Sequence, residues 1–130
     1  MNILLAASEV VPYAKTGGLA DVAGALPKAL ARLGHRVRVV MPRYQIDKIT
    51  AHTETLPLRL SVPFNFQNRE TTVYIDRTGE VPVYFIDAPE YFSRGRLYGE
   101  QDDADRFAFF SRAVVEQRIK QNRKLADKRK

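Results

Sequence analysis

The start of the chain alternates between strand-like and helix-like hydrophobic patterns, and this alternation restricts it to few folds. Residues 3–7 form the continuous apolar run ILLAA, which is typical of a strand covered on both faces. From Leu19 apolar residues recur at spacings of three and four, which indicates a helix, and RVRVVMP at residues 36–42 predicts a second strand. Strand, helix and strand over this length form a right-handed βαβ unit. We therefore expect an α/β fold with a Rossmann-like parallel sheet.

The predicted first helix carries two local signals beside its periodicity. Pro27 lies inside the pattern, and because proline lacks an N–H and clashes with the preceding turn, we expect a kink or a split into two helices. Gly34 stands where helices commonly end in a left-handed residue, so His35 after it is expected in a surface turn. The apolar positions that define the helix are Leu19, Val22, Ala23, Leu26, Ala29, Leu30 and Leu33.

The middle of the chain has a different pattern. Residues 56–64 and 69–76 alternate apolar with polar side chains, which predicts half-exposed antiparallel strands inserted beside the parallel ones. A turn at 76–82 leads into a mostly apolar strand at 81–89, and residues 90–101 lack periodicity and are expected to form a loop.

A last helix is expected after that loop. Asp102 or Asp103 can cap its N-terminus, since their carboxylates accept hydrogen bonds from free backbone N–H groups. Its apolar stripe is predicted to contain Phe107, Phe110, Ser111, Val114 and Val115, with Ile119 as a further member. The acidic residues 102, 103 and 105 fit a helix start better than a metal site.

The net charge of +6 comes entirely from the end of the chain. Residues 117–130 contain seven basic residues and one acidic residue, whereas residues 1–116 are neutral. This basic tail either extends the last helix or frays. Nucleic-acid binding is the least favoured function class, because the tail has no aromatic residue on which a base could stack.

The composition excludes several other classes. The absence of cysteine removes disulfides, thiolate metal sites and a cysteine nucleophile. The N-terminal apolar run is too short for a signal peptide or a membrane span. We therefore expect a soluble protein of the bacterial cytoplasm or the plastid stroma, with no membrane partner.

The segment KTGGLADVAG, residues 15–24, lies between the first strand and the first helix. A helix N-terminus attracts anions, glycines let a ligand approach the backbone, and Lys15 adds a positive charge, so the segment suits a diphosphate. On local physics alone, a tight turn at Gly17 and Gly18 with a solvated Lys15 is an equal alternative. Neither the P-loop nor the dinucleotide fingerprint is present.

The longer stretch at residues 7–44, ASEVVPYAKTGGLADVAGALPKALARLGHRVRVVMPRY, resembles the N-terminus of bacterial glycogen synthases and plastid starch synthases. The segments RGRLYGE at 94–100 and DADRFAFFSRAVVE at 103–116 are similar to the same family. The resemblance implies a retaining GT-B glycosyltransferase of family 5 that transfers glucose from ADP-glucose to an α-1,4-glucan. It implies no metal and no cofactor.

The resemblance also implies roles for individual residues. Lys15 would contact the diphosphate, and Gly17 and Gly18 would lie against the nucleotide sugar. Asp21 would lie near the sugar and the acceptor. Tyr98 would be an aromatic residue on the acceptor side, with a core tyrosine as the alternative, and Glu9 is a weaker candidate that we interpret as a loop-ordering carboxylate. No residue of this chain is assigned as catalytic.

Family members are several times longer than this chain, so we expect it to be a truncated N-terminal piece. Residues 1–116 would form part of the N-terminal catalytic domain, and residues 117–130 would be a basic tail outside it. Such a fragment is expected to be inactive alone and prone to self-association through exposed apolar surface. The alternative is a fragment that binds glucan or phosphate without catalysis.

Overall fold

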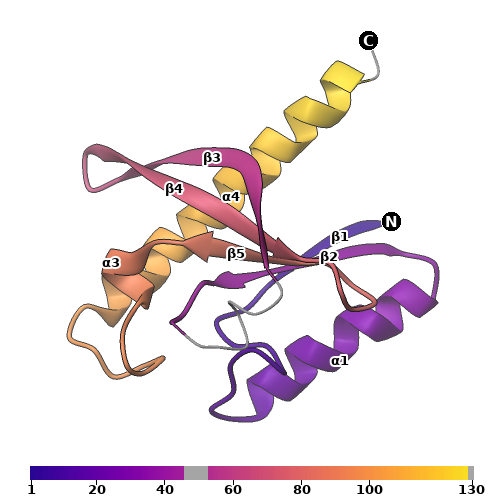
Figure 1. The fold of residues 1–130 in the computed structure, drawn as a ribbon, viewed down its shortest axis with the longest axis horizontal. Coiled ribbons are helices and arrows are strands. Elements are labelled where there is room, and N and C mark those ends of the chain that lie inside the picture. The colour runs from indigo at the N-terminus through magenta and orange to yellow at the C-terminus, as the bar shows by residue number, and fades with distance from the viewer. Residues whose placement is uncertain (46–52, 129–130) are drawn as a thin grey trace.

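The computed structural model describes residues 1–45 and 53–128. These residues form one five-stranded sheet with the strand order β1-β2-β5-β4-β3, together with two long helices and one short one (Figure 1). The elements in chain order are β1 (Asn2–Ala6), α1 (Gly18–Arg32), β2 (Arg36–Pro42), β3 (Glu54–Phe64), β4 (Gln67–Asp76), β5 (Val83–Asp87), α3 (Pro89–Phe92) and α4 (Asp103–Lys128).

The sheet combines a parallel half with an antiparallel half, as the sequence predicts. β1 pairs parallel with β2, and β2 pairs parallel with β5. β4 is antiparallel to both β5 and β3. The Rossmann-like βαβ unit with an inserted antiparallel hairpin is therefore confirmed, and β3 runs in the same direction as β1, β2 and β5.

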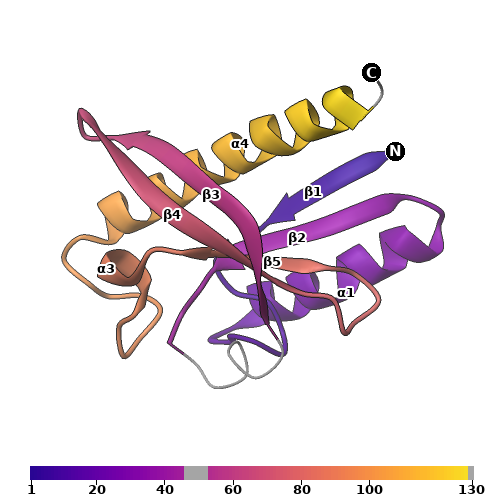
Figure 2. The ribbon, with the colours of Figure 1, turned by 45° about the horizontal axis from the view of Figure 1, so that its top comes forward.

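The two long helices lie on opposite faces of the sheet. Both views show α1 on one side and α4 on the other (Figures 1 and 2). The core between them is rich in aromatic side chains. Phe109 of α4, for example, packs against Phe64 of β3 and Tyr91 of α3, with ring centroids 5.6 and 5.0 Å apart.

Only part of the apolar stripe expected on the first helix faces the core: Ala23 is buried and Leu30 is partly buried against it. α1 buries Ala20, Ala23 and Pro27, whereas Leu19, Val22, Leu26 and Leu33 are among the exposed hydrophobic residues. Small side chains face inward because the helix lies very close to the preceding loop. A Cβ atom on Gly24 would be only 3.0 Å from the carbonyl oxygen of Val11.

The two boundary signals of this helix have different outcomes. α1 continues without a break through Pro27, so the expected split into two helices is wrong. The C-terminal signal is confirmed: Gly34 has φ +95°, and its N–H and that of His35 donate to the carbonyl groups of Ala31 and Leu30. This pair of hydrogen bonds is a Schellman motif, which only a residue tolerant of positive φ closes without strain.

The region between the last strand and the last helix is not wholly a loop. Residues Pro89–Phe92 form the short helix α3, which buries Tyr91 and Phe92. Pro89 stands at the start of this helix, where the missing N–H of proline needs no partner. The expected loop is therefore confined to residues 93–102.

The last helix buries part of the face that was expected. Phe110 is buried and Phe107 and Val114 are partly buried against the core, as expected, whereas Ser111 and Val115 are exposed. Its other buried residues are Arg106, Phe109, Ala113 and Gln117. The side chain of Ile119 lies outside the described residues. Neither Asp102 nor Asp103 caps the helix with its carboxylate: Asp102 binds Arg94, and Asp103 accepts hydrogen bonds from the N–H groups of Gly99 and Glu100 in the loop before it.

The basic tail continues the helix rather than fraying at its first residues, because α4 runs unbroken to Lys128. Lys120 donates a hydrogen bond to the carbonyl group of Arg59 in β3. Within residues 1–45 and 53–128, no helix is long and apolar enough to cross a membrane, and no group of His, Cys, Asp and Glu side chains could hold a metal ion.

Candidate functional site

The candidate site is formed by the loop that connects β1 to α1, at the carboxyl edge of the parallel strands. This edge is where open α/β sheets bind ligands. Gly17 is the N-cap residue of α1 and has an extended backbone, with φ −163°. Gly17 has no side chain that could cap the helix, and the buried Glu9 carboxylate accepts its N–H at 3.2 Å. The first turn of α1 carries a partial positive charge and lies beside Lys15.

Neither glycine of the pair is required by the chain itself. A Cβ atom on Gly17 or Gly18 would have no heavy atom within 4 Å, and neither residue has a positive φ. The alternative from the sequence, a tight turn with a solvated Lys15, does not by itself require glycine at these two positions. Because neither residue has a side chain, the backbone at this helix N-terminus faces open space, which suits the close approach of an anion.

Lys15 and Asp21 are brought together at the entrance of this space. The ammonium group of Lys15 lies 2.9 and 3.0 Å from the two carboxylate oxygens of Asp21, and both side chains are more than half exposed. Asp21 stands in the first turn of α1. An exposed ion pair of this kind is weak and exchanges easily, so a bound anion can take over the lysine.

Glu9 lies directly beneath the glycines and is only 2% exposed. One carboxylate oxygen accepts the hydroxyl hydrogen of Thr16 at 2.5 Å, and the other accepts the N–H of Gly17 at 3.2 Å. Burial alone would raise the pKa of this carboxyl, but the hydrogen bonds from Thr16, Tyr98 and Gly17 outweigh it and hold the pKa below its ordinary value. Glu9 is therefore ionised near neutral pH and orders the loop.

Tyr98 reaches the same carboxylate from a distant part of the chain. Its hydroxyl donates to Glu9 at 3.1 Å and lies 2.6 Å from the hydroxyl of Ser8. Since the single phenol hydrogen goes to Glu9, Ser8 is the donor in the second bond. Burial and the Glu9 carboxylate raise the pKa of the Tyr98 phenol. The ring packs on Phe107 but stays 37% exposed, so one side is available at the surface.

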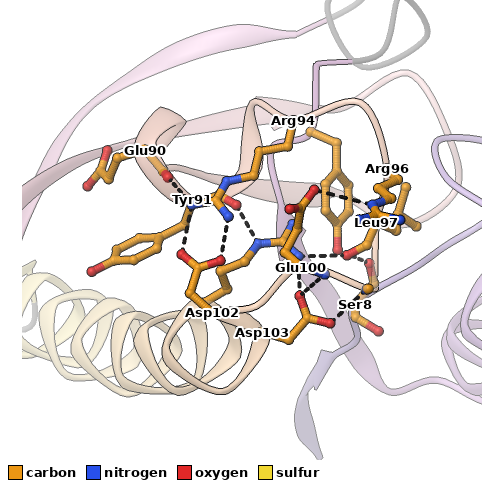
Figure 3. Close-up of polar contacts among 12 residues, drawn as sticks. Ser8, Glu90, Tyr91, Arg94, Arg96, Leu97, Glu100, Asp102 and Asp103 are labelled. Atoms are coloured by element: carbon orange, nitrogen blue, oxygen red, sulfur yellow. Dashed lines mark hydrogen bonds and ion pairs between the residues drawn. The ribbon is translucent and has the colours of Figure 1, made fainter.

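The loop that carries Tyr98 is tied to α4 by two arginines (Figure 3). Arg94 forms an ion pair with Asp102 at 2.5 Å. Arg106 is fully buried, donates to the carbonyl groups of Tyr91 and Leu97, and pairs with Asp103 at 2.7 Å. These contacts hold Tyr98 in place beside the β1–α1 loop.

Comparison with known proteins now gives the family. A sequence profile described as the starch synthase catalytic domain matches residues 2–126. The chain belongs to this family. It is 48% identical over 117 residues to the glycogen synthase of Bacillus subtilis (strain 168) and 48% identical over 123 residues to that of Koribacter versatilis (strain Ellin345). Each alignment covers 89% of this chain, but the chain spans only about a quarter of each relative, 24% and 25%.

A solved structure agrees with the sequence comparison. The catalytic domain of starch synthase IV from Arabidopsis thaliana, bound to ADP and acarbose, is similar with a TM-score of 0.82 and 34% identity. The similarity covers 93% of this chain and 25% of that one. The fold is therefore that of the N-terminal portion of a starch synthase catalytic domain with GT-B architecture, and the resemblance seen in the sequence is confirmed.

Within this starch synthase fold, several residues of the site carry no signal in the sequence. Ser8 and Tyr44 join the network only through the fold: the Tyr44 hydroxyl donates to the Ser8 carbonyl group at 2.6 Å. Arg106 occurs in a helix rich in charged residues, and nothing in its spacing distinguishes a buried arginine from an exposed one. Its position three residues after Asp103 is the one usable hint, since i,i+3 pairs meet on a helix.

A second hollow in this starch synthase fold lies apart from Lys15 and the glycine pair. A mainly apolar cavity of about 570 Å³ lies between α1 and the β4–β5 turn, with Val11, Ala23, Pro27 and Val81 among its lining residues. At its wall, Tyr13 donates to the Asp76 carboxylate at 2.5 Å. Burial, together with that carboxylate, raises the pKa of Tyr13, so the phenol keeps its proton.

Proposed function

We propose that this chain carries the part of a glucosyltransferase site that holds the diphosphate of ADP-glucose for transfer of glucose to an α-1,4-glucan. The single observation that carries the proposal is the open space at Gly17 and Gly18, which lies at the N-terminus of α1 beside Lys15. The similar Arabidopsis structure is bound to ADP and acarbose, which supports a nucleoside diphosphate and a glucan-like sugar as ligands.

In the proposed reaction, the bond between the glucose C1 atom and the diphosphate oxygen breaks, and a bond from C1 to a hydroxyl oxygen of the glucan forms with retention of configuration. ADP leaves with the bonding electrons, so negative charge grows on the diphosphate. Lys15 and the N-terminal N–H groups of α1 stabilise this charge. To do so Lys15 exchanges its partner Asp21 for the phosphate, and Asp21 becomes free to accept a hydrogen bond from a sugar hydroxyl.

On the acceptor side we assign Tyr98. A sugar ring packs well on an aromatic face, and the exposed part of the Tyr98 ring lies next to the loop that carries the proposed phosphate site. The group that takes the proton of the acceptor hydroxyl is not assigned to a residue of this chain. The proposal includes a setting in the bacterial cytoplasm or the plastid stroma, as the family resemblance implies.

ADP titration of the 15N-labelled chain, followed by amide chemical shifts, tests the proposal. We expect saturable shifts of Lys15, Gly17 and Gly18 with a Kd of roughly 1 mM or weaker. Lys15→Ala removes the shifts, whereas Lys28→Ala, at an exposed lysine in the middle of α1, leaves them unchanged. In a full-length synthase that carries this N-terminal region, Lys15→Ala lowers kcat/KM for ADP-glucose. The loss corresponds to about 1.5–3 kcal/mol of transition-state stabilisation. If Lys15→Ala shows the same ADP-induced shifts or the same kcat/KM as the unaltered protein, the phosphate role is excluded.

A second candidate is a chain that binds glucan or phosphate but does not catalyse. It is favoured by the share of the relatives that this chain spans, about a quarter, because a site completed by other parts of the fold would leave binding groups without catalysis. Nucleic-acid binding through the basic tail ranks below both, and its signature would be a salt-dependent affinity lost on deletion of residues 118–130.

A further inference from the structure

The tip of the β3–β4 hairpin is strained. Its two turn residues, Asn65 and Phe66, have φ +50° and +62°, as type I′ turns require. Asparagine followed by glycine is the usual pair in such a turn, because positive φ is unfavourable for residues with a bulky side chain. Phenylalanine at position 66 therefore makes the hairpin less stable than glycine would.

The Phe66 ring is also completely exposed, with a relative accessibility of 111%. The ring gains no burial from the described residues, so a ligand or partner that covered it would supply that burial. The base of the hairpin is rigid by contrast. Phe64 packs edge-on against Tyr91 and Phe109, with centroids 6.2 and 5.6 Å apart. The ring is therefore presented on a fixed support.

The surroundings of the ring indicate the chemistry of the ligand. Asn65, Gln67 and Asn68 are exposed, and their side-chain amides have no hydrogen-bond partner among residues 1–45 and 53–128. Residues 63–68 contain no charged side chain and line a shallow hollow of about 280 Å³. A neutral surface of one aromatic face and three amides matches a neutral ligand rich in hydroxyl groups, and residues 63–68 offer no cation to the phosphates of a nucleotide or nucleic acid.

The tip lies on the same edge of the sheet as the proposed phosphate site. β3 is antiparallel to β4, and β4 is antiparallel to β5, so β3 ends at the carboxyl edge at which β1 ends. β1 and β3 are the two outer strands, four strand intervals apart, which corresponds to roughly 19 Å. The ribbon shows the hairpin projecting beyond the rest of the sheet (Figure 2). A single small ligand does not cover both places, but a polymer can.

We propose that Phe66 and the amides of Asn65, Gln67 and Asn68 form a second glucan-binding platform, which holds a remote stretch of the α-1,4-glucan whose end is presented near Tyr98. The assignment to an α-1,4-glucan rests on the proposed function, while the preference for a neutral sugar polymer rests on the tip itself. Two attachment points on one polymer raise the effective concentration of its end at the transfer site.

Native electrophoresis in gels that contain glycogen tests the platform, with dextran gels as the polymer control and thermal unfolding of every variant. We expect glycogen but not dextran to retard the chain. Phe66→Gly weakens the glycogen affinity about tenfold, the upper range for one aromatic contact. It also raises the Tm by roughly 3–5 °C, since glycine relieves the strained turn. Phe66→Tyr keeps the affinity, and Leu33→Ala, another exposed apolar residue, leaves it unchanged.

Three results would overturn the proposal: no retardation of the unaltered chain by glycogen, equal retardation of Phe66→Gly, or loss of self-association in Phe66→Gly with unchanged glycogen binding. The last would assign the tip to contact between copies. The gels contain no nucleotide, so they test the platform independently of ADP binding. If the unaltered chain does not bind ADP but Phe66→Gly still weakens glycogen binding, the phosphate proposal is refuted and the platform proposal is supported.

Discussion

Lys15 binds both carboxylate oxygens of Asp21, at 3.0 and 2.9 Å, directly in front of the helix N-terminus that we assign to the diphosphate. The ligand-free chain thus holds its proposed phosphate-binding cation in an internal ion pair. Both side chains are more than half exposed, so the pair is weak and can be displaced.

This competition predicts that Asp21→Asn strengthens binding of ADP to the chain. Removing the carboxylate frees Lys15, and an exposed pair of this kind is worth about 0.2–1 kcal/mol, so the Kd should fall by about 1.5- to 5-fold. Isothermal titration or amide shifts can measure it, with Asp105→Asn as a control at another exposed carboxylate. In a full-length synthase the same change should lower kcat, since Asp21 is assigned to the sugar. Weaker ADP binding in Asp21→Asn would contradict the competition.

Glu9 predicts a pH-dependent contribution to stability. Its folded-state pKa is below the ordinary value of 4.5, so the ionised form is favoured by folding. Such stability is fully present above about pH 4.5 and is lost as the pH falls through the lower folded-state pKa. At pH 7, Glu9→Gln should therefore reduce the free energy of unfolding by about 2 kcal/mol, and the difference from the unaltered chain should shrink in acid.

Denaturant unfolding at pH 7 and pH 3 measures this difference. Glu54→Gln serves as the control, because Glu54 is exposed. A gap between Glu9→Gln and the unaltered chain that stays constant over this range would show that the charge of Glu9 does not order the loop.

Gly18 and Gly24 predict opposite outcomes for the same substitution. A Cβ on Gly18 meets open space, so Gly18→Ala should keep or raise the Tm, because alanine is up to about 1 kcal/mol better than glycine in a helix. It should nevertheless weaken ADP binding, since the new methyl group occupies the space assigned to the ligand. Gly24→Ala should lower stability by about 1–3 kcal/mol, because its Cβ would lie 3.0 Å from the Val11 carbonyl oxygen. Full ADP affinity in Gly18→Ala would refute the phosphate reading of that glycine.

The sequence predicted the parallel pair β1–β2 and the antiparallel strands because strand and helix periodicities are local and a strand–helix–strand connection favours a parallel pair. It predicted only part of the buried face of each long helix. Leu19 and Leu26 have the hydrophobicity of core residues, yet the close approach of α1 to Val11 admits only small side chains such as Ala20 and Ala23. The distance between α1 and the loop at Val11 determines which face of the helix is buried, and a single sequence does not reveal this distance.

The same limit applies to the candidate site. Lys15 and Asp21 are six residues apart, and the βα loop brings them together, so a local motif was enough to propose them. Glu9 and Tyr98 are 89 residues apart and meet only because Arg94 and Arg106 tie the second loop to α4. Patterning identified Tyr98 as a candidate through family resemblance, but its hydrogen bond to Glu9 depends on the complete fold.

The basic tail should be separable from the sheet. Among the described side chains beyond Gln117, Lys120 contacts the sheet through a hydrogen bond to the Arg59 carbonyl group. Deleting residues 118–130 should therefore bring the pI close to neutral and change the Tm by only a few degrees, on the scale of about 1 kcal/mol. Differential scanning calorimetry decides the matter, and a drop of more than about 10 °C would mean that the tail packs as part of the domain.

The chain alone should not transfer glucose at the rate of an intact synthase. Holding donor and acceptor in line supplies a large part of enzymatic rate enhancement, up to about 7–11 kcal/mol, and it requires groups on every side of the reacting atoms. The groups that we assign to the diphosphate are Lys15 and the α1 N-terminus, with Tyr98 beside them, and we assign none to its opposite side. With no group on that side, water screens the Lys15 charge and weakens its effect on the leaving ADP.

Incubation of the purified chain with labelled ADP-glucose and glycogen measures the transfer directly, and the glycogen synthase of Bacillus subtilis (strain 168) provides the positive control. We expect no label above background in glycogen, although the chain still binds ADP weakly. Incorporation at a rate comparable to the control would show that these residues complete a catalytic site without further parts of the family fold.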